Sequence, residues 1–505
     1  MACVAYKKTI VMSAVLLLVL SCSNDSDLSL SANNANNHGN DPNTPHASDS
    51  AVSTDSPHPN ATDTDPHNHG DSNNANNNDN NGVDTSPQTS TDPPPLVFLP
   101  WDPPTFNNQE LPPGMPVVNI EISAEDAQSL DANPYTAEDV LGDFTDGNGK
   151  TYTQARINYR GAYQLKNIIE HEGLRNWKVK FAANNMYLNR REWNFNYEPH
   201  FRQKLALDLL RFADVRVPSA QHVILQVNGR NQGMYLQYED PDSKNWLFDM
   251  FGYDDGDLYK AALDMPLLED HEKCFATFET LGTDFTSAQN GYMCHYNKKT
   301  NHKRAPYDYT TIGEFIVALN NTPESDIEGW FYENFDVESF LSYLVVSNFI
   351  ANWDSYPQRP KNFWVYHNPR SQNLIFIPWD LDNTFHEAST WDRYNQMGTT
   401  ASIFYELDKH DYREIHSLEG KERPLARRLI KIPAVRQAYI NRYRALVASM
   451  LNPAYLGARI DELNAIVSPH ISSYDRTELS SANTGMKSFV EKRHPNVIDQ
   501  LNAQP

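Results

Sequence analysis

Between residues 112 and 240, apolar and polar residues alternate in several short stretches, which is the pattern of half-buried β-strands. The stretch 116–123, PVVNIEIS, alternates in this way. In the stretch 176–181, NWKVKF, the aromatic residues and the valine share one side of the predicted strand, and Lys178 and Lys180 share the other. These segments therefore predict strands that bury one face.

Turn signals and one helical pattern complete this half. Asp-Gly-Asn-Gly at 146–149 and Asn-Gly at 228–229 are residue types that tight hairpin turns require. Residues 199–214 have apolar side chains three and four positions apart, with Pro199 at the start. We expect a mostly antiparallel sheet with one long helix.

The second half has mainly helical periodicity. One further hairpin is predicted at 362–382, with its turn at Asn368-Pro369. A small β-rich part at 96–240 and a larger helical part at 241–505 predict an α+β fold of two lobes, with a ligand cleft between them. The helical segments are 309–321, 336–353, 424–451 and 456–471.

The N-terminus has the features of a secretory signal. Two lysines precede an apolar run that is too short for a permanent membrane helix, and residues 1–21 end just before Cys22. The sequence around Cys22 resembles the lipobox of bacterial lipoproteins, which implies lipidation of this cysteine and an outer-membrane location in a Gram-negative host. The alternative is an ordinary cleaved signal. Residues 22–95 are rich in Asn, Asp, Ser and Pro and predict a disordered linker.

The charge is distributed unevenly along the chain. The formal net charge is −23. The signal contributes +2 and the linker −11, which leaves −14 for residues 96–505. Such an acidic body argues against nucleic-acid partners, because these require a basic surface.

Two cysteines remain in the body, Cys274 and Cys294. In an oxidising compartment they predict a disulfide. The alternative is a zinc site that also uses His271 and His295.

Four polar side chains converge on the 362–382 hairpin. Asp354 follows a predicted helix, Asn362 opens the hairpin, and Asp380 and Asp382 follow its second strand in IPWDLDNTF. Phosphoryl transfer needs a carboxylate that orients the attacking hydroxyl and oxygen ligands that hold Mg²⁺. Protein kinases supply an Asp, an Asn and a second Asp in this order. The common phosphate-loop, nucleophile-elbow and HExxH signatures are absent from the sequence.

An ordered series of motifs resembles the CotH kinase family, the spore-coat protein H-like proteins. The resemblance implies an atypical protein-kinase fold over roughly residues 115–475. The chain departs from the family by an insertion after Arg160-Gly161, and by Arg175 and Asn176 where relatives have lysines. The motifs are INYRG (157–161), NWKVKF (176–181), FRQKLALDLL (201–210), VNGRNQGMYLQYE (227–239), GDLYKA (256–261), NWD (352–354), KNFWVYHNP (361–369), IPWDLDNTF (377–385) and PLARRLIKIPAVRQAY (424–439).

The resemblance implies a role for each residue of the hairpin group. Asp354 would be the catalytic aspartate, and Asn362 and Asp380 would be metal ligands. Asp382 would support them or bind a second metal ion. The implied cofactors are ATP and Mg²⁺ or Mn²⁺.

Four residues of the β-rich part are candidate nucleotide contacts. Lys178, Lys180 and Arg160 are candidates for binding phosphate, and the alternative for the lysines is a solvated strand face. Glu239 would contact the nucleotide or pair with a lysine, and the alternative is a salt bridge between the lobes.

The sequence thus predicts an extracytoplasmic, lipid-anchored protein Ser/Thr kinase of surface or coat proteins. Two alternatives remain open: a non-catalytic structural or adhesion lipoprotein with a kinase-like fold, and a metal-dependent hydrolase.

Overall fold

The structure is a computed structural model. It describes residues 114–132, 134, 137–161, 174–261, 274–386, 397–408 and 421–505, all of which belong to one unit, residues 88–505. The predicted signal peptide, Cys22 and the linker lie outside the described residues.

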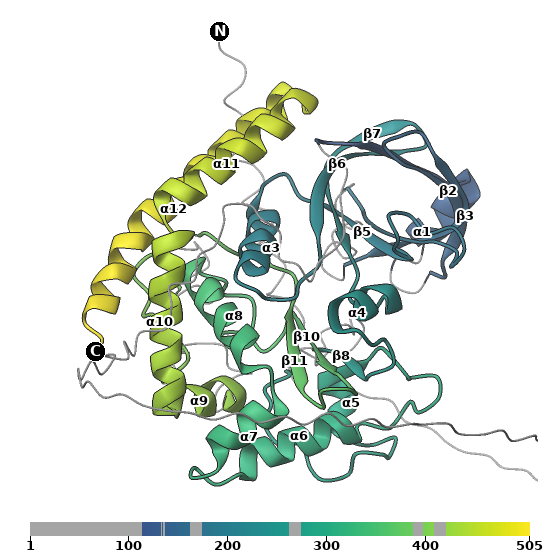
Figure 1. Ribbon diagram of the computed structural model, residues 1–505. Coiled ribbons are helices and arrows are strands. Elements are labelled where there is room, and N and C mark those ends of the chain that lie inside the picture. The colour runs from purple at the N-terminus through teal and green to yellow at the C-terminus, as the bar shows by residue number, and fades with distance from the viewer. Residues whose placement is uncertain are drawn as a thin grey trace, which may run out of the picture. The chain divides into compact units, whose positions relative to one another are not determined.

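Seven strands form a closed barrel in the order β1-β2-β3-β4-β5-β7-β6 (Figure 1). Six of the seven neighbouring pairs are antiparallel, as the alternating sequence predicts, and β1 closes the barrel by pairing in parallel with β6. The inward side chains make a core of their own that is rich in aromatic residues. The strands are β1 (Val117–Glu121), β2 (Val140–Thr145), β3 (Thr151–Arg160), β4 (Asn176–Lys180), β5 (Glu192–Tyr197), β6 (Ala220–Val227) and β7 (Arg230–Glu239).

The predicted turns and helix of this half are present. The residues 146–149 connect β2 to β3, and Asn228 and Gly229 connect β6 to β7 with φ values of 50° and 71°. This left-handed backbone is the reason for Asn-Gly at a two-residue hairpin turn. Helix α3 (Arg202–Phe212) lies between β5 and β6 in the chain and packs against β6 and against α8 (Val337–Phe349).

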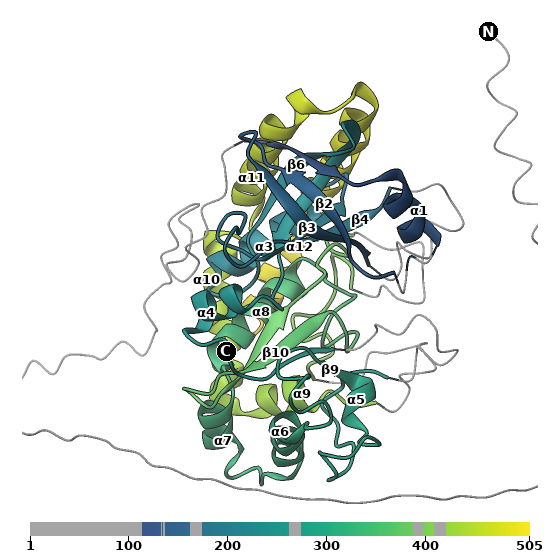
Figure 2. The same cartoon turned by 90° about the vertical axis from the view of Figure 1, so that its right-hand side faces the viewer.

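The rest of the described chain is mainly helical and contains a second, four-stranded sheet of order β11-β10-β8-β9. In both views the strand β10 lies between the barrel and the helices α6 and α9 (Figures 1 and 2). The α+β fold class predicted from sequence is confirmed. The remaining elements are α1 (Ala124–Ala132), α4 (Lys244–Phe251), β8 (Leu258–Ala261), α5 (Tyr292–His295), β9 (Tyr296–Lys298), α6 (Thr310–Asn321), α7 (Ile327–Asn334), β10 (Phe363–His367), β11 (Leu374–Pro378), α9 (Pro424–Lys431), α10 (Pro433–Ser449), α11 (Pro453–Val467), η3 (Ser468–His470) and α12 (Ser473–Asn502).

Three features differ from the sequence-based expectation. The single helix predicted for 424–451 is two helices, α9 and α10, because Pro433 cannot continue the first and instead starts the second. The long helix α12 was not predicted. The hairpin at 362–382 is present, and β8, which was not predicted, pairs with β10 and extends it into a sheet.

Cys274 and Cys294 form a disulfide with a Cα–Cα distance of 5.5 Å, as predicted. Both sulfur atoms are thereby used, so the zinc alternative has no thiolate ligands here. His271 lies outside the described residues. Within the ranges that the structure describes, no helix has the length and apolar character needed to cross a membrane.

A buried ion pair joins the end of β7 to the rest of the barrel. Glu239 is fully buried and accepts hydrogen bonds from Arg190 Nε at 2.7 Å, from the Ser219 backbone N–H at 2.7 Å and from Trp246 Nε1 at 3.2 Å. Arg190 also donates to Asp249 in α4 at 2.5 Å. These contacts attach α4 to the barrel through the buried Arg190 and Glu239 and the partly exposed Asp249.

We expect Arg190→Met to destabilise the protein by about 3 kcal/mol, because it leaves the buried Glu239 carboxylate without its ionic partner. Urea unfolding measures this loss. Lys244→Met is the control: Lys244 is exposed and its ion pair with Asp254 is 3.7 Å long, so its effect should stay within about 0.5 kcal/mol. Equal stability of both variants would contradict this role of the buried pair.

Candidate functional site

The β10–β11 hairpin brings Asn362 and Asp380 to the same end of the small sheet. In the antiparallel register, Phe363 lies opposite Pro378, and the Trp379 backbone N–H donates to the Asn362 carbonyl oxygen at 3.1 Å. Asn362 and Asp380 both have left-handed backbone, with φ values of 58° and 56°. Non-glycine residues rarely adopt this conformation except where the surroundings impose it, often at functional sites.

Asp354 lies against Asn362, as the sequence predicted. The Asn362 side-chain amide donates to the backbone oxygen of Asp354 at 2.7 Å and to its carboxylate oxygen Oδ2 at 3.2 Å. The amide nitrogen therefore faces Asp354, and the amide oxygen faces the opposite way. Within the described residues this oxygen accepts no hydrogen bond, so it is available to a ligand.

Two cations that the sequence analysis missed hold Asp354. Arg359 Nη1 lies 2.9 Å from Oδ1, and Lys361 Nζ lies 2.8 Å from Oδ2. Asp354 is itself only 6% exposed. The signal was present in PQRPKN, where two basic residues stand between Asp354 and Asn362, but spacing alone does not show that both turn back to the aspartate.

Asp380 and Asp382 are half-buried carboxylates with too little positive charge around them. Burial and the nearby Asp354 carboxylate raise the pKa of Asp380, although Lys361, Arg160 and Lys260 act in the opposite direction. Burial, together with Asp380 and Asp354, raises the pKa of Asp382 to about 8. Carboxylates in such a cluster are tolerated best beside a divalent cation.

Glu198 is a further acidic residue of the site that the sequence did not reveal. It lies between β5 and α3, is 3% exposed, and neither of its carboxylate oxygens has a hydrogen-bond partner within the described part of the chain. Burial, followed by Asp382 and Asp380, raises its pKa well above the usual value, and the nearby Gln203 backbone N–H and Arg202 offset this only in part. A glutamate before a proline has no distinctive sequence signal, since only packing brings it to the aspartates.

Arg160 connects the barrel to the aspartates. Its Nη1 donates to Asn196 and to the Tyr238 hydroxyl. The guanidinium carbon lies 5.3 Å from the Tyr238 ring centroid and 5.8 Å from that of Trp379, which directly precedes Asp380. The structure thus brings Arg160, a candidate phosphate contact, to the site. Trp379 is buried and contributes to packing.

Lys260, which belongs to the GDLYKA motif, also lies here. It is paired with Trp364 across β8 and β10, and its Nζ is 5.5 Å from that ring centroid. Its positive charge lowers the pKa of Asp380. The pairing of β8 with β10 is therefore what brings this lysine to the site.

The two strand lysines, Lys178 and Lys180, form their ion pairs with acidic side chains other than Asp354, Asp380 and Asp382. Lys178 Nζ lies 2.6 Å from Glu192 and 2.8 Å from Asp240. Burial acts to lower the pKa of Lys178, but Asp240 and Glu192 outweigh it and raise the pKa. Lys180 Nζ lies 3.1 Å from Asp139.

Glu239 forms a salt bridge, but with Arg190 of the same β-rich part and not between the predicted lobes. Its carboxylate is enclosed by Arg190, Ser219 and Trp246. It is fully buried, so the geometry favours a structural ion pair over a nucleotide contact, and its cationic partner is an arginine rather than the expected lysine.

The donor set suits a hard divalent cation. A cation held here would take carboxylate oxygens from Asp380 and Asp382, and the amide oxygen of Asn362, which accepts no hydrogen bond within the described residues. Across the described ranges, no group of three or more His, Cys, Asp or Glu side chains is placed to hold a metal ion. A site with only two carboxylates and one amide is consistent with this finding, because Mg²⁺ in phosphoryl-transfer sites takes its other ligands from water and phosphate oxygens.

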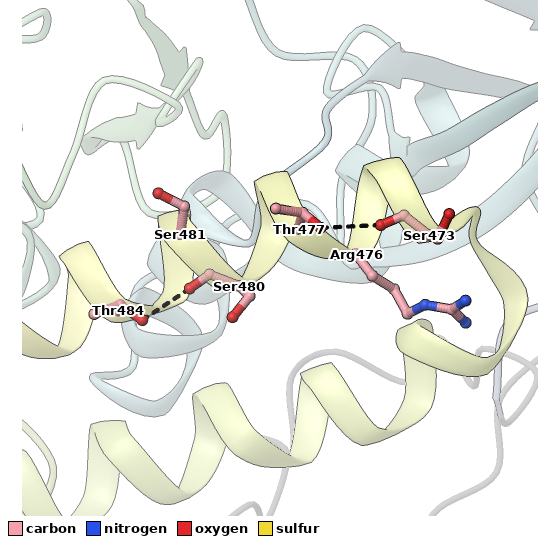
Figure 3. Close-up of a pocket in the computed structure, with 6 residues that line it drawn as sticks. All are labelled: Ser473, Arg476, Thr477, Ser480, Ser481 and Thr484. Atoms are coloured by element: carbon pink, nitrogen blue, oxygen red, sulfur yellow. Dashed lines mark hydrogen bonds between the residues drawn. The ribbon is translucent and has the colours of Figure 1, made fainter. Parts of the chain in front are cut away.

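Two pockets on the described surface lie at other residues. One, of about 630 Å³, is lined by residues of α12, whose side chains are mostly short hydroxyls (Figure 3). The other, of about 430 Å³, lies along α6. Neither includes any of the aspartates. The α12 residues are Ser473, Arg476, Thr477, Ser480, Ser481 and Thr484.

We expect Asp382→Asn to stabilise the protein by about 2 kcal/mol at pH 8 in the absence of divalent cations. The folded-state pKa of Asp382 is raised to about 8, so ionisation destabilises the fold as the pH rises from the unfolded pKa toward 8. The gain should therefore be smaller at pH 5. Urea unfolding at both pH values measures it.

Asp461→Asn is the control for this substitution. Asp461 is exposed and pairs with Lys487 at 2.6 Å, so its change should be within about 0.5 kcal/mol at either pH. A loss of stability in Asp382→Asn at pH 8 would show that its charge is balanced in the folded protein.

Comparisons with known proteins agree with the motif series. The family model described as CotH kinase protein matches residues 157–497. The inner spore coat protein H of Bacillus subtilis strain 168 is 24% identical over 239 residues, which is 46% of this chain and 60% of that protein. The match thus spans less than two thirds of the relative's length.

Two solved structures are also similar. One is a complex of the Shewanella oneidensis MR-1 toxin–antitoxin system HipA, HipB and its operator DNA, with 12% identity, a TM-score of 0.32 and coverage of 76% of this chain and 82% of that one. The other is the Helicobacter pylori proinflammatory kinase CtkA, with 10% identity, a TM-score of 0.28 and coverage of 64% and 94%. At these TM-scores neither likeness bears on function.

Proposed function

Because this chain belongs to the CotH kinase protein family, we propose that it transfers the γ-phosphoryl group of ATP to Ser or Thr side chains of surface or coat proteins. The proposed cofactors are ATP and Mg²⁺ or Mn²⁺. In this proposal the barrel is the small lobe of a two-lobed kinase, and the helical part with the β10–β11 hairpin is the large lobe.

One observation carries the proposal: Asp354, Asn362 and Asp380 lie together at one end of the β10–β11 hairpin. Asn362 contacts Asp354 at 3.2 Å, and Asp354 acts electrostatically on Asp380. Asp354 would orient the acceptor hydroxyl, and Asn362, Asp380 and Asp382 would hold the metal. When bound, the cation neutralises charge on the phosphates.

The residues have distinct roles in the transfer. The hydroxyl oxygen of the acceptor forms a bond to the γ-phosphorus while the bond from that phosphorus to the β,γ-bridging oxygen breaks, and the electron pair leaves with ADP. Asp354 accepts the hydroxyl proton. Arg160 and Lys260 supply positive charge near Asp380 that would favour the polyphosphate.

The proposed location and partners follow from the N-terminal sequence. Lipidation of Cys22 would attach the protein to a bacterial membrane, and the linker would separate the kinase from the lipid. The acceptor would then be a protein at the cell surface or in the periplasm.

One observation favours the alternative of a non-catalytic surface protein. Both carboxylate oxygens of Asp354 are occupied, by Arg359 and by Lys361. A general base must release such partners before it receives a proton. In this alternative, the ion pairs of Asp354 stabilise the structure of its loop and Asp354 has no catalytic role.

We expect Asp380→Ala and Asp354→Ala to separate binding from transfer. Asp380→Ala should abolish nucleotide binding that depends on the metal, because it removes a cation ligand. Asp354→Ala should keep binding but reduce transfer at least about 100-fold, the usual contribution of general base catalysis. Thermal shift with Mn²⁺ and ATP, each alone and together, measures binding, and transfer of label from [γ-³²P]ATP measures activity.

Asp326→Ala is the control for both variants. Asp326 precedes α7, remote from the hairpin in sequence, and its side chain contacts Ser325 at the surface. A wild-type protein that shows the joint Mn²⁺–ATP shift yet transfers no label to itself or to surface proteins would favour the non-catalytic alternative. A wild-type protein without the shift would contradict nucleotide binding altogether.

A further inference from the structure

Tyr238, near the end of β7, contacts both the barrel residue Arg160 and the hairpin residue Trp379. Its ring packs against the ring of Trp379, with centroids 5.3 Å apart. Its hydroxyl oxygen accepts a hydrogen bond from Arg160 Nη1. Because Trp379 directly precedes Asp380 in the chain, Tyr238 connects a candidate phosphate contact to the segment that carries a proposed metal ligand.

The guanidinium of Arg160 is held along one edge only. Its Nη1 donates to the Tyr238 hydroxyl and to the Asn196 side-chain oxygen, which accounts for two of the five N–H donors of an arginine. Among the residues that the structure describes, Nε and Nη2 make no hydrogen bond or ion pair. These two nitrogens form the edge with which a guanidinium binds an oxyanion through two parallel N–H groups.

The contacts at Nη1 also fix the plane of the guanidinium. The Tyr238 and Trp379 ring centroids lie 5.3 Å and 5.8 Å from its central carbon. A flexible arginine loses side-chain entropy when it binds a ligand, and an arginine that is already held loses less. Tyr238 is itself only 1% exposed, so it can improve the binding of an anion to Arg160 without touching that anion.

We propose that Tyr238 is a positioning residue for nucleotide binding, whose hydroxyl and ring hold Arg160 with its Nε–Nη2 edge open to a phosphate oxygen of ATP. This inference rests on the proposed function and deepens it, since it states what sets the orientation of a phosphate-binding charge. The sequence assigned no role to Tyr238.

The test compares wild type with Tyr238→Phe, Arg160→Met and the double variant. Tyr238→Phe removes only the hydroxyl and keeps the ring that packs against Trp379. Isothermal titration calorimetry on full-length protein measures the affinity for Mn²⁺ alone and for ATP at saturating Mn²⁺, and thermal unfolding checks that each variant is folded.

Tyr235→Phe is the matched control. Tyr235 lies in the same strand and is fully buried, but it belongs to the core inside the barrel. Its hydroxyl donates to the backbone oxygen of Arg175 at 2.9 Å. This variant therefore also loses one tyrosine hydrogen bond, without a change at Arg160.

We expect Tyr238→Phe to lower the affinity for ATP about fivefold, because the guanidinium loses one of the two acceptors that hold it. Its affinity for Mn²⁺ alone should equal that of wild type. Arg160→Met should lower ATP affinity about tenfold or more, through loss of a charge-assisted contact. The double variant should bind ATP as Arg160→Met does, because Tyr238 acts only through Arg160. Tyr235→Phe should bind both ligands like wild type.

Three results would overturn the inference. Wild-type ATP affinity in Tyr238→Phe shows that Asn196 is sufficient to hold Arg160. An equal loss in Tyr235→Phe, or a parallel loss of affinity for Mn²⁺ alone, shows that the hydroxyl only maintains the structure. A further loss in the double variant relative to Arg160→Met shows that Tyr238 acts independently of Arg160.

Failure of the proposed function gives a different result. A wild-type protein that binds Mn²⁺ but not ATP contradicts nucleotide binding itself and, with it, this role of Tyr238. That result is recognised before any variant is compared.

Discussion

Mutual repulsion among buried and half-buried carboxylates is the constraint on which the candidate site depends. Asp354, Asp380, Asp382 and Glu198 lie close enough to act on one another, and burial adds to the cost of their charges. Ionised groups are retained inside a protein only with partners or with a bound cation. Asp354 has both of its oxygens paired, whereas the oxygens of Glu198 have no hydrogen-bond partner among the described residues. The negative charge of the site is therefore not fully balanced near Asp380 and Asp382.

The architecture around the site supplies positive charge from separate elements. Arg160 comes from the end of β3, Lys260 from β8, and Lys361 from the loop before β10. Two of them are held by aromatic contacts that also organise the fold: Arg160 lies over the Tyr238 and Trp379 rings, and Lys260 lies over Trp364. Trp379 packs edge-on against Trp364, with ring centroids 5.5 Å apart. Aromatic packing therefore sets where these charges lie relative to Asp380.

Sequence reasoning was most successful where neighbours in the chain are neighbours in space. The alternation of NWKVKF, the Asn-Gly turn and the separation of Asn362 from Asp380 by one hairpin all concern short loops, and the structure contains each of them. The same reasoning placed Asp354 beside Asn362, eight positions away. It predicted a single helix where Pro433 separates two. It also did not find α12, whose polar exposed surface gives a weak apolar periodicity.

The sequence by itself determined the class of the chain, the aspartate–asparagine–aspartate group and the cysteine pair, because local periodicity, turn chemistry and motif order carry that information. Only the tertiary structure decided that β1 closes the barrel onto β6, that Glu239 is enclosed by Arg190, and that Glu198 and Lys361 join the aspartates. These facts depend on packing between distant segments and on the exclusion of water. An isolated lysine or glutamate in the chain looks the same whether it will be solvated or buried beside like and unlike charges.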